Sequence, residues 1–264
     1  MDRNRHVAIW LRMLAKKEIA ESRNTFHLLK TQGAKIASAY QKDGRYGVER
    51  AIEKGQEQWV RVFVALFSTT IRQFKEYIKT QLPKKKEIKE IKANFLDRAL
   101  AYVSAQAYMK SKYVTATNHE IVKNVISHGI EKGLSEVQIA KNIKTQFVDI
   151  PAKSRARTIA RTEVHLAAGY GMQSGAEEAE IPLMMREWVT VEDERTRPEH
   201  LAADTQKRGM DEPFDVGGEQ MDFPGDGSDP GNNINCRCTI IYIPADTNFS
   251  GGGNAPPGTF IGEE

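Results

Sequence analysis

Apolar side chains recur every three or four residues through most of the first half of this chain. In an α-helix that spacing gathers them on one side, where they pack against neighbouring helices. The stretch from Val7 to Leu29 has the same character, and residues 43–47, Asp-Gly-Arg-Tyr-Gly, are expected to form a loop. The pattern predicts several helices around a common core. Its two clearest stripes, before and after Pro83, comprise Trp59, Val62, Phe63, Leu66, Phe67, Thr70, Phe74 and Ile78, then Ile88, Ile91, Phe95, Ala99, Tyr102, Val103 and Gln106.

Two shorter helices are predicted from their start and stop signals. Asn118 is expected to cap the first of them, and Gly133 to end it. Ser135 and Gln138 have the spacing of a capping box, in which each side chain bonds to the backbone of the other residue. Pro151 is then expected to end the second helix.

A further helix is predicted over residues 152–179. Arg157, Arg161 and His165 stand four residues apart along it, so their side chains share one face. Stacked positive charges repel one another, and an acidic partner should therefore cover this face. His165 is expected at a polar surface or interface.

After Pro182 the pattern changes to short strands separated by polar loops. Residues 186–192 and 239–243 are rich in β-branched and aromatic side chains and are predicted as strands. The stretch between them is rich in Gly, Pro and Asp, and a loop of that length is usually functional or pinned by something. The predicted fold class is α+β, with a mainly helical first part followed by a small domain of short strands and long polar loops.

Charge is distributed very unevenly along the chain. Residues 1–161 hold 32 Lys and Arg against 15 Asp and Glu, a formal charge of +17, whereas residues 162–264 hold 6 against 20, or −14. A basic first half suits contact with a nucleic acid or an acidic surface. The alternative is that the two halves attract each other within the chain. The run 84–86, Lys-Lys-Lys, is interpreted as a solvated turn rather than a DNA contact.

Membrane insertion and disulfide bonding are both disfavoured. The longest apolar run, residues 62–67, is far shorter than the roughly 20 residues needed to cross a bilayer. The first residues lack the pattern of a signal peptide. Cys236 and Cys238 are two residues apart, too close for an unstrained disulfide, so reduced thiols in a cytosolic setting are expected.

Three short motifs stand out in the second half of the chain. They run Ala-Arg-Thr-Glu over 160–163, then Trp188 followed by Asp-Glu-Arg-Thr-Arg-Pro-Glu-His over 193–200, then Cys-Arg-Cys over 236–238. In this order and at these spacings they resemble the C-terminal domain of the phage Mu F-like head morphogenesis family. The similarity covers roughly residues 135–244. The motif residues are Arg161, Thr162, Glu163, Trp188, Asp193, Arg195, Arg197, His200, Cys236 and Cys238.

The resemblance implies a minor head protein of a tailed phage. Such a protein lies in the head interior, is present in the host cytoplasm during assembly, and acts with the portal and other head proteins in procapsid assembly, DNA packaging or DNA delivery. Phage DNA is a further candidate partner, and no enzymatic turnover is expected. The chain then divides into a basic helical domain (1–117), a Mu F-like domain (118–244) and a disordered Gly/Pro tail (245–264).

The second and third motifs together carry the residue types of a metal site. Thiolates and imidazole suit zinc, and His200, Cys236 and Cys238 supply three ligands, to which Asp193 could add a fourth. A structural zinc would pin the polar loop between the two strands. The alternative is that both cysteines are small buried core residues.

The charged motif residues allow two interpretations. In the first, Arg161 and Glu163 anchor the helix to the sheet and Asp193, Arg195 and Arg197 join them in one polar network. In the second, the domain is a phosphodiesterase or toxin-like nuclease, with His200 as general base and Arg161 or Arg197 stabilising the transition state. The sequence shows no clear acid partner for such a site, so the structural interpretation is preferred.

Overall fold

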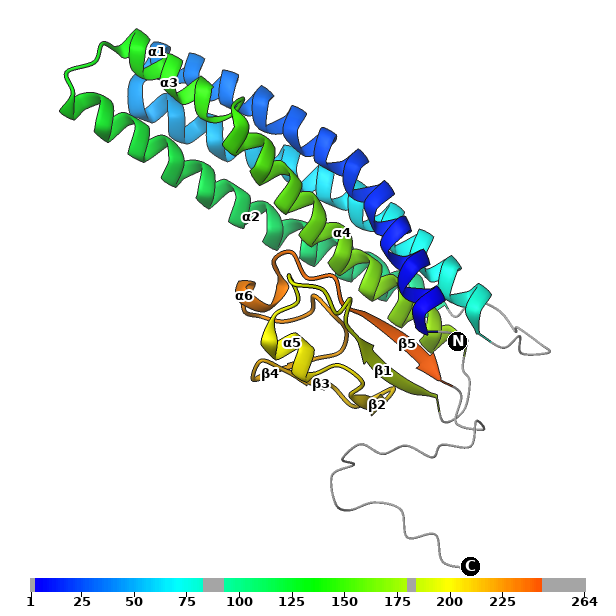
Figure 1. The fold of residues 1–264 in the computed structure, drawn as a ribbon. Helices are drawn as coiled ribbons and strands as arrows, with labels where there is room; N and C mark the ends of the chain where they lie inside the picture. Colours follow the sequence, from blue (N-terminus) through cyan, green and yellow to red (C-terminus); the bar gives the residue numbers. More distant parts are fainter. Residues whose placement is uncertain (1–2, 83–92, 180–183, 244–264) are drawn as a thin grey trace, which may run out of the picture.

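The computed structural model describes residues 3–82, 93–179 and 184–243. Most of this chain is a bundle of long helices, and a small α+β region lies against α4 near the N-terminus (Figure 1). This order confirms the predicted α+β class. The helices are α1 (Arg3–Gln81), α2 (Ala93–Glu131), α3 (Glu136–Gln146), α4 (Ile150–Glu178), α5 (Pro198–Ala202) and α6 (Pro230–Asn233). The strands are β1 (Met185–Val189), β2 (Lys207–Gly209), β3 (Phe214–Val216), β4 (Glu219–Met221) and β5 (Thr239–Ile243).

Helix α1 is a hairpin of two antiparallel arms, here called the N-terminal arm (residues 3–43) and the C-terminal arm (residues 45–81). Only Gly44 leaves the helical conformation, with φ 59° and ψ −142°, which a residue without a Cβ adopts easily. The predicted loop over 43–47 is therefore a single-residue break. Gln32 ties the arms together, because its side chain donates to the Gly55 carbonyl and accepts from the Trp59 indole, both at 2.8 Å.

Helix α2 is longer than the sequence signals indicated, and the predicted cap at Asn118 is wrong. Asn118 lies inside α2 and is only 1% exposed. Its amide donates to Gln32 and its carbonyl oxygen accepts from Arg155 at 2.8 Å. The polar side chain thus bonds across the bundle core instead of to its own backbone, while Val114 and Val122 continue the buried stripe on either side.

The turns around α3 follow the predicted signals in part. The capping box of Ser135 and Gln138 is present, and Gly133 after α2 has a left-handed φ of 66°. Pro151, however, lies in the first turn of α4 instead of ending α3, because its missing N–H costs nothing there. Helix α3 ends at Gln146, and its C-cap residue Phe147 has a buried ring that packs closely on Gly33, where an added Cβ would lie 2.3 Å from the Phe147 Cβ.

The α+β region is built on a three-stranded antiparallel sheet in the order β2-β1-β5, beside a hairpin of β3 and β4. The strand predicted at 239–243 is confirmed as β5. The strand predicted at 186–192 runs over 185–189, because the backbone N–H of Thr190 bonds to the Asp204 carboxylate at 2.6 Å instead of a neighbouring strand.

Ion pairs join the basic helices to the acidic region within the chain. Arg3 contacts the carboxylates of Glu187 at 3.0 Å and Asp204 at 2.5 Å, and Lys79 lies 2.9 Å from Glu178. Part of the opposite charge is therefore compensated inside one molecule.

Some predicted features lie in residues that the structure does not describe, and the predicted domain division is not tested by it. The Lys run at 84–86 and the tail at 245–264 lie outside the described residues. Residues 117 and 118 both lie within α2, and the proposed division into domains stays a prediction. None of the helices that the structure describes is long and apolar enough to cross a membrane.

Candidate metal centre

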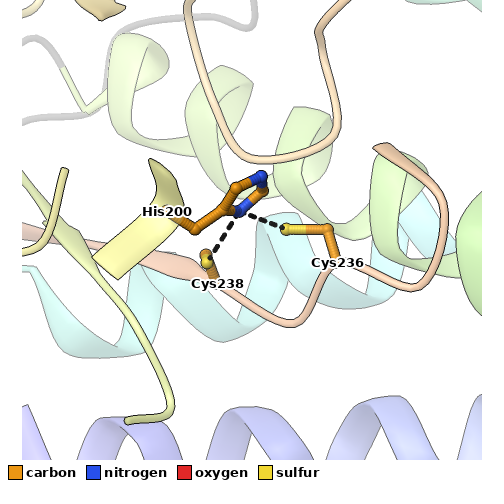
Figure 2. A group of neighbouring side chains, drawn as sticks. All are labelled: His200, Cys236 and Cys238. Carbon is orange, nitrogen blue, oxygen red and sulfur yellow. Dashed lines mark hydrogen bonds between the residues drawn. The ribbon is translucent and has the colours of Figure 1, made fainter. Parts of the chain in front are cut away.

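Three buried side chains from two separate segments meet beside the sheet. His200 comes from α5, and Cys236 and Cys238 come from the segment that leads into β5. The Nδ1 atom of His200 lies 3.4 Å from the Cys238 sulfur and 3.6 Å from the Cys236 sulfur (Figure 2). The three potential ligand atoms lie within 4.8 Å of one another, and all three residues are buried.

Local structure aims each side chain at this point. Helix α5 begins at Pro198, which suits a first helical turn, so His200 faces inward and its ring contacts the Trp188 ring edge to face at 6.1 Å. Asn235 has a left-handed φ of 59°, which turns the chain just before the cysteines. Asn tolerates that conformation better than most residues. The sulfurs two residues apart are thereby both brought to the imidazole.

Helix α4 positions the cysteine segment through hydrogen bonds from residues in and next to the first motif (160–163). Thr162 accepts a hydrogen bond from the Asn235 backbone N–H, and the Arg161 guanidinium donates to the Asn235 side chain, both at 3.3 Å. His165 Nε2 donates to the Cys238 carbonyl at 2.8 Å, since a carbonyl oxygen can only accept. The helix motif therefore positions the backbone that carries both sulfurs.

His165, expected at a polar surface or interface, does not lie at the surface but inside the chain, between α4 and the cysteine segment. Its side chain is fully buried and packs against Trp10 of the N-terminal arm, with ring centroids 5.8 Å apart. A helical spacing of four residues aligned His165 with Arg161 correctly, but that row passes under the cysteine segment. The sequence offered no signal for this, because the covering segment lies about 70 residues away.

The electrostatics of the group favour one thiolate. The Cys238 thiol, as a hydrogen-bond donor, lowers the pKa of Cys236 well below its usual value, and nearby His165 and His200 lower it further. The same bond and burial raise the pKa of Cys238. The Nε2 atom of His200 has no hydrogen-bond partner among the described residues. Deprotonated sulfur and a neutral imidazole nitrogen are the forms that bind metals.

The donor geometry fits zinc. Tetrahedral Zn²⁺ with bonds of about 2.0–2.1 Å to nitrogen and about 2.3 Å to sulfur separates the two donors by roughly 3.5–3.6 Å. The two Nδ1–Sγ distances of 3.4 and 3.6 Å agree with that separation. A His-Cys-Cys group of this kind could hold a metal, and it would supply three of the usual four ligands.

Asp193, the predicted fourth ligand, is not part of this group. Its carboxylate is bound by the Arg237 guanidinium, with one contact at 2.6 Å, and by Arg195 at 3.2 Å. These bonds lower the pKa of Asp193, with the Arg237 hydrogen bond the largest cause. The sequence could not indicate this pairing, because Arg237 stands between the cysteines and its side chain direction depends on the turn at Asn235.

The single network predicted for the charged motif residues is also not found. Arg161 pairs with Glu18 of α1 at 3.3 Å, whereas Glu163 lies 3.7 Å from Lys110 of α2. Arg197 instead donates to the Ile234 carbonyl. Of the charged motif residues, Asp193 and Arg195 contact each other, whereas Arg161, Glu163 and Arg197 each meet a different partner outside the motifs.

Burial has a strong effect on Glu163. Its side chain lies between α4 and α2, and desolvation raises the pKa of this carboxyl to about 7, although Lys110 acts in the opposite direction. Its Oε2 atom accepts no hydrogen bond from a described residue. Glu163 thus belongs to the bundle core and not to the cysteine group.

Arg186 is an organising residue that sequence analysis missed. It is fully buried, and its guanidinium donates to the backbone carbonyls of Gly209, Glu212 and Asp222. It also lies 5.1 Å from the centre of the Phe214 ring. Its position at the start of a predicted strand was visible in the sequence, but nothing there indicated that the β2–β3 connection and the segment after β4 converge on it.

A shallow hollow adjoins the cysteine group on its polar side. Three arginines line it together with the three candidate ligands, and one of these arginines, Arg237, is paired with Asp193. The lining residues are Val191, Arg195, Thr196, Arg197, His200, Asn235, Cys236, Arg237 and Cys238.

Fold and site together define a long helical bundle carrying a small α+β domain whose loops meet at a His-Cys-Cys group. The sequence model of the family described as phage Mu protein F like protein matches residues 120–241. This stretch is therefore a phage Mu protein F-like domain, of a family linked to phage head morphogenesis, and the predicted resemblance is confirmed.

One curated relative adds a second comparison. The chain is 27% identical over 154 residues to an uncharacterized protein, YqbB, of Bacillus subtilis (strain 168), an alignment that covers 56% of this chain and 49% of the relative. The chain thus spans about half the length of the curated relative it matches. No solved structure matches the chain significantly.

Proposed function

We propose that the chain is a minor head protein of a tailed phage, situated in the capsid interior. The observation that carries the proposal is the phage Mu protein F-like domain over residues 120–241. The architecture supports an assembly role, since α4 of that domain packs along α1 and so joins the domain to the long helical bundle.

The partner within the head is the portal protein, with which the chain acts in procapsid assembly, DNA packaging or DNA delivery. Helices suit this role because they offer long, rigid faces for docking. Several acidic residues of the second half are occupied by intramolecular pairs such as Arg3–Glu187 and Lys79–Glu178. Basic side chains on the outer helix faces remain available for other molecules.

A structural zinc at His200, Cys236 and Cys238 belongs to the same proposal. The fit of the two Nδ1–Sγ distances supports it. When bound, the metal would tie α5 to the segment that leads into β5. Asp193 is excluded from the ligand set, and a fourth ligand would come from solvent in the adjoining hollow.

The protein acts without catalytic turnover in this proposal. A general base must reach a substrate proton, but His200 is 2% exposed and its Nδ1 faces two sulfurs. Arg161 is paired with Glu18, and Arg197 with a backbone carbonyl. Nuclease activity that disappears in a folded His200→Ala variant would instead favour the phosphodiesterase alternative.

The test is composition and co-purification. Procapsids of the phage or prophage that encodes the chain are analysed by mass spectrometry, and the tagged chain is purified with the portal protein at low and physiological salt. Presence in procapsids and a stable portal complex are expected. Absence from procapsids would overturn the proposal, and presence without portal binding at either salt would remove the portal as partner.

A further inference from the structure

The outer face of the N-terminal arm of α1 carries a straight row of basic side chains. At about 100° per residue, the row falls within an arc of roughly 40° around the helix axis. All its members are exposed. We call this row the basic stripe; it comprises Arg5, Arg12, Lys16, Arg23 and Lys30.

The stripe lies opposite the packed side of the arm. Leu14 points about 180° away from the centre of the stripe and Leu29 about 120° away, and both are buried in the bundle core. Figure 1 shows the arm, in dark to lighter blue, along one edge of the bundle, and every member of the stripe is exposed. The stripe is therefore open along its length.

The acidic residues of the arm do not neutralise the stripe. Glu18 turns toward α4 and pairs with Arg161 at 3.3 Å, and Glu21 is buried and pairs with Lys17 at 3.2 Å. Within the parts of the chain that the structure describes, four stripe members form no ion pair: Arg12, Lys16, Arg23 and Lys30.

Helix α4 extends the positive surface beside the arm. Lys153 lies over the Phe26 ring, 5.9 Å from its centre, so α4 runs directly alongside the middle of the arm. Arg157, one turn further along α4, is exposed. Two more cations thus flank the stripe on one side.

The length and composition of the stripe suit contact with the phosphate backbone of a nucleic acid better than contact with a protein. From Arg12 to Lys30 it spans about 27 Å, at about 1.5 Å per residue. Protein interfaces depend on buried apolar anchors, whereas Ala15 and Ala20 stand beside the stripe and Ile19 is its one large exposed apolar neighbour among the described residues. Small neighbours let long Lys and Arg side chains approach a phosphate row closely.

We propose that the basic stripe binds the phosphate backbone of double-stranded DNA without reading its sequence. The proposal rests on the proposed location in the head, where packaged DNA supplies the phosphates that a row of cations would bind. Each cation that neutralises a phosphate releases counterions, so four contacts give a slope of about −3.6 for log affinity against log salt concentration. Between about 50 and 200 mM salt the affinity should then fall about 150-fold.

The test measures fluorescence anisotropy of the full chain on random-sequence duplexes of about 24 base pairs, three times the length the stripe spans at 3.4 Å per step. The double variant Arg23→Gln, Lys30→Gln should reduce the slope by about 2 and weaken binding about 30-fold near 150 mM salt. The matched control is Arg61→Gln, Arg72→Gln, which removes two exposed charges from the C-terminal arm, where Glu57 and Glu76 are also exposed. The control should bind like the unaltered chain.

Three results would overturn the proposal: no binding at low salt, binding that does not depend on salt, or equal losses in both double variants. Loss of portal binding by the stripe variant with unchanged DNA binding would assign the stripe to a protein instead. Procapsid content separates this inference from the proposed function. A chain found in procapsids that fails to bind DNA refutes the stripe alone, whereas a chain missing from procapsids refutes the head location.

Discussion

Replacing Glu163 with Gln should stabilise the protein at alkaline pH and leave its stability nearly unchanged in acid. Glu163 is 7% exposed, and burial raises the pKa of its carboxyl from 4.5 to about 7. Below about pH 4.5 the carboxyl is protonated in both the folded and the unfolded chain. As pH rises toward 7, the unfolded chain ionises first, so the free energy of unfolding falls.

The size of the effect follows from the difference between the two pKa values. About 2.5 units at 1.36 kcal/mol each give a loss of roughly 3 kcal/mol, complete a little above pH 7. Glu163→Gln removes the ionisation with little change in shape. At pH 8 the free energy of unfolding of the variant should therefore be higher than that of the unaltered chain by up to about 3 kcal/mol. The gain is reduced by the loss of the ion pair between Glu163 and Lys110.

Urea unfolding of both proteins at pH 5, 6, 7 and 8 measures this difference. Asp226, whose pKa burial raises to about 6, titrates in both proteins and largely cancels in the comparison. A difference that stays constant with pH would show that Glu163 does not titrate on unfolding. A variant less stable at pH 8 than at pH 5, relative to the unaltered chain, would show that Glu163 is ionised and that its pairing with Lys110 dominates.

Three further predictions concern the cysteine group and the bundle. Cys238→Ser should abolish a stoichiometric zinc signal in elemental analysis, and chelation should lower the melting temperature of the unaltered chain; no zinc in the unaltered chain would leave the thiols as plain core residues. The Asp193→Asn variant should retain its full zinc content, because no member of the His-Cys-Cys group is changed. Its loop should become more sensitive to limited proteolysis, because Arg237 loses its ion-pair partner. Loss of zinc from this variant would show that Asp193 is a ligand. The Gly33→Ala substitution should lower the free energy of unfolding by about 3 kcal/mol in thermal unfolding, because its Cβ would lie 2.3 Å from the Phe147 Cβ. Most of that loss should vanish in a Phe147→Ala background. Equal losses in both backgrounds would show that the contact with Phe147 is not the cause.

Local signals in the sequence determined the elements themselves. Helical spacing of apolar residues predicted both arms of α1, and the capping box at Ser135 with Gly133 before it predicted the α2–α3 turn. The run of β-branched and aromatic residues over 239–243 predicted β5. These features depend on backbone conformation and on side chains within one or two turns, so they can be read directly from neighbouring residues.

The sequence also determined three members of the candidate centre. His200, Cys236 and Cys238 were selected by residue type and by the motif order of the Mu F-like family, and the fold brings them together. Residue type limits which groups can bind a soft metal, so the choice of ligands is narrow even without a structure.

Only the tertiary structure decided which polar groups meet. Asn118 has the residue type of a helix cap but lies within a continuous helix and bonds to Gln32, and Asp193 has that of a ligand but is held by Arg237. His165, expected at a polar surface or interface, is fully buried because the cysteine segment packs over it. A polar side chain takes whichever partner lies nearest once the core has packed, and that partner comes from any distance along the chain. Apolar periodicity sets which face of a helix is buried, but the neighbour on that face is decided by packing alone.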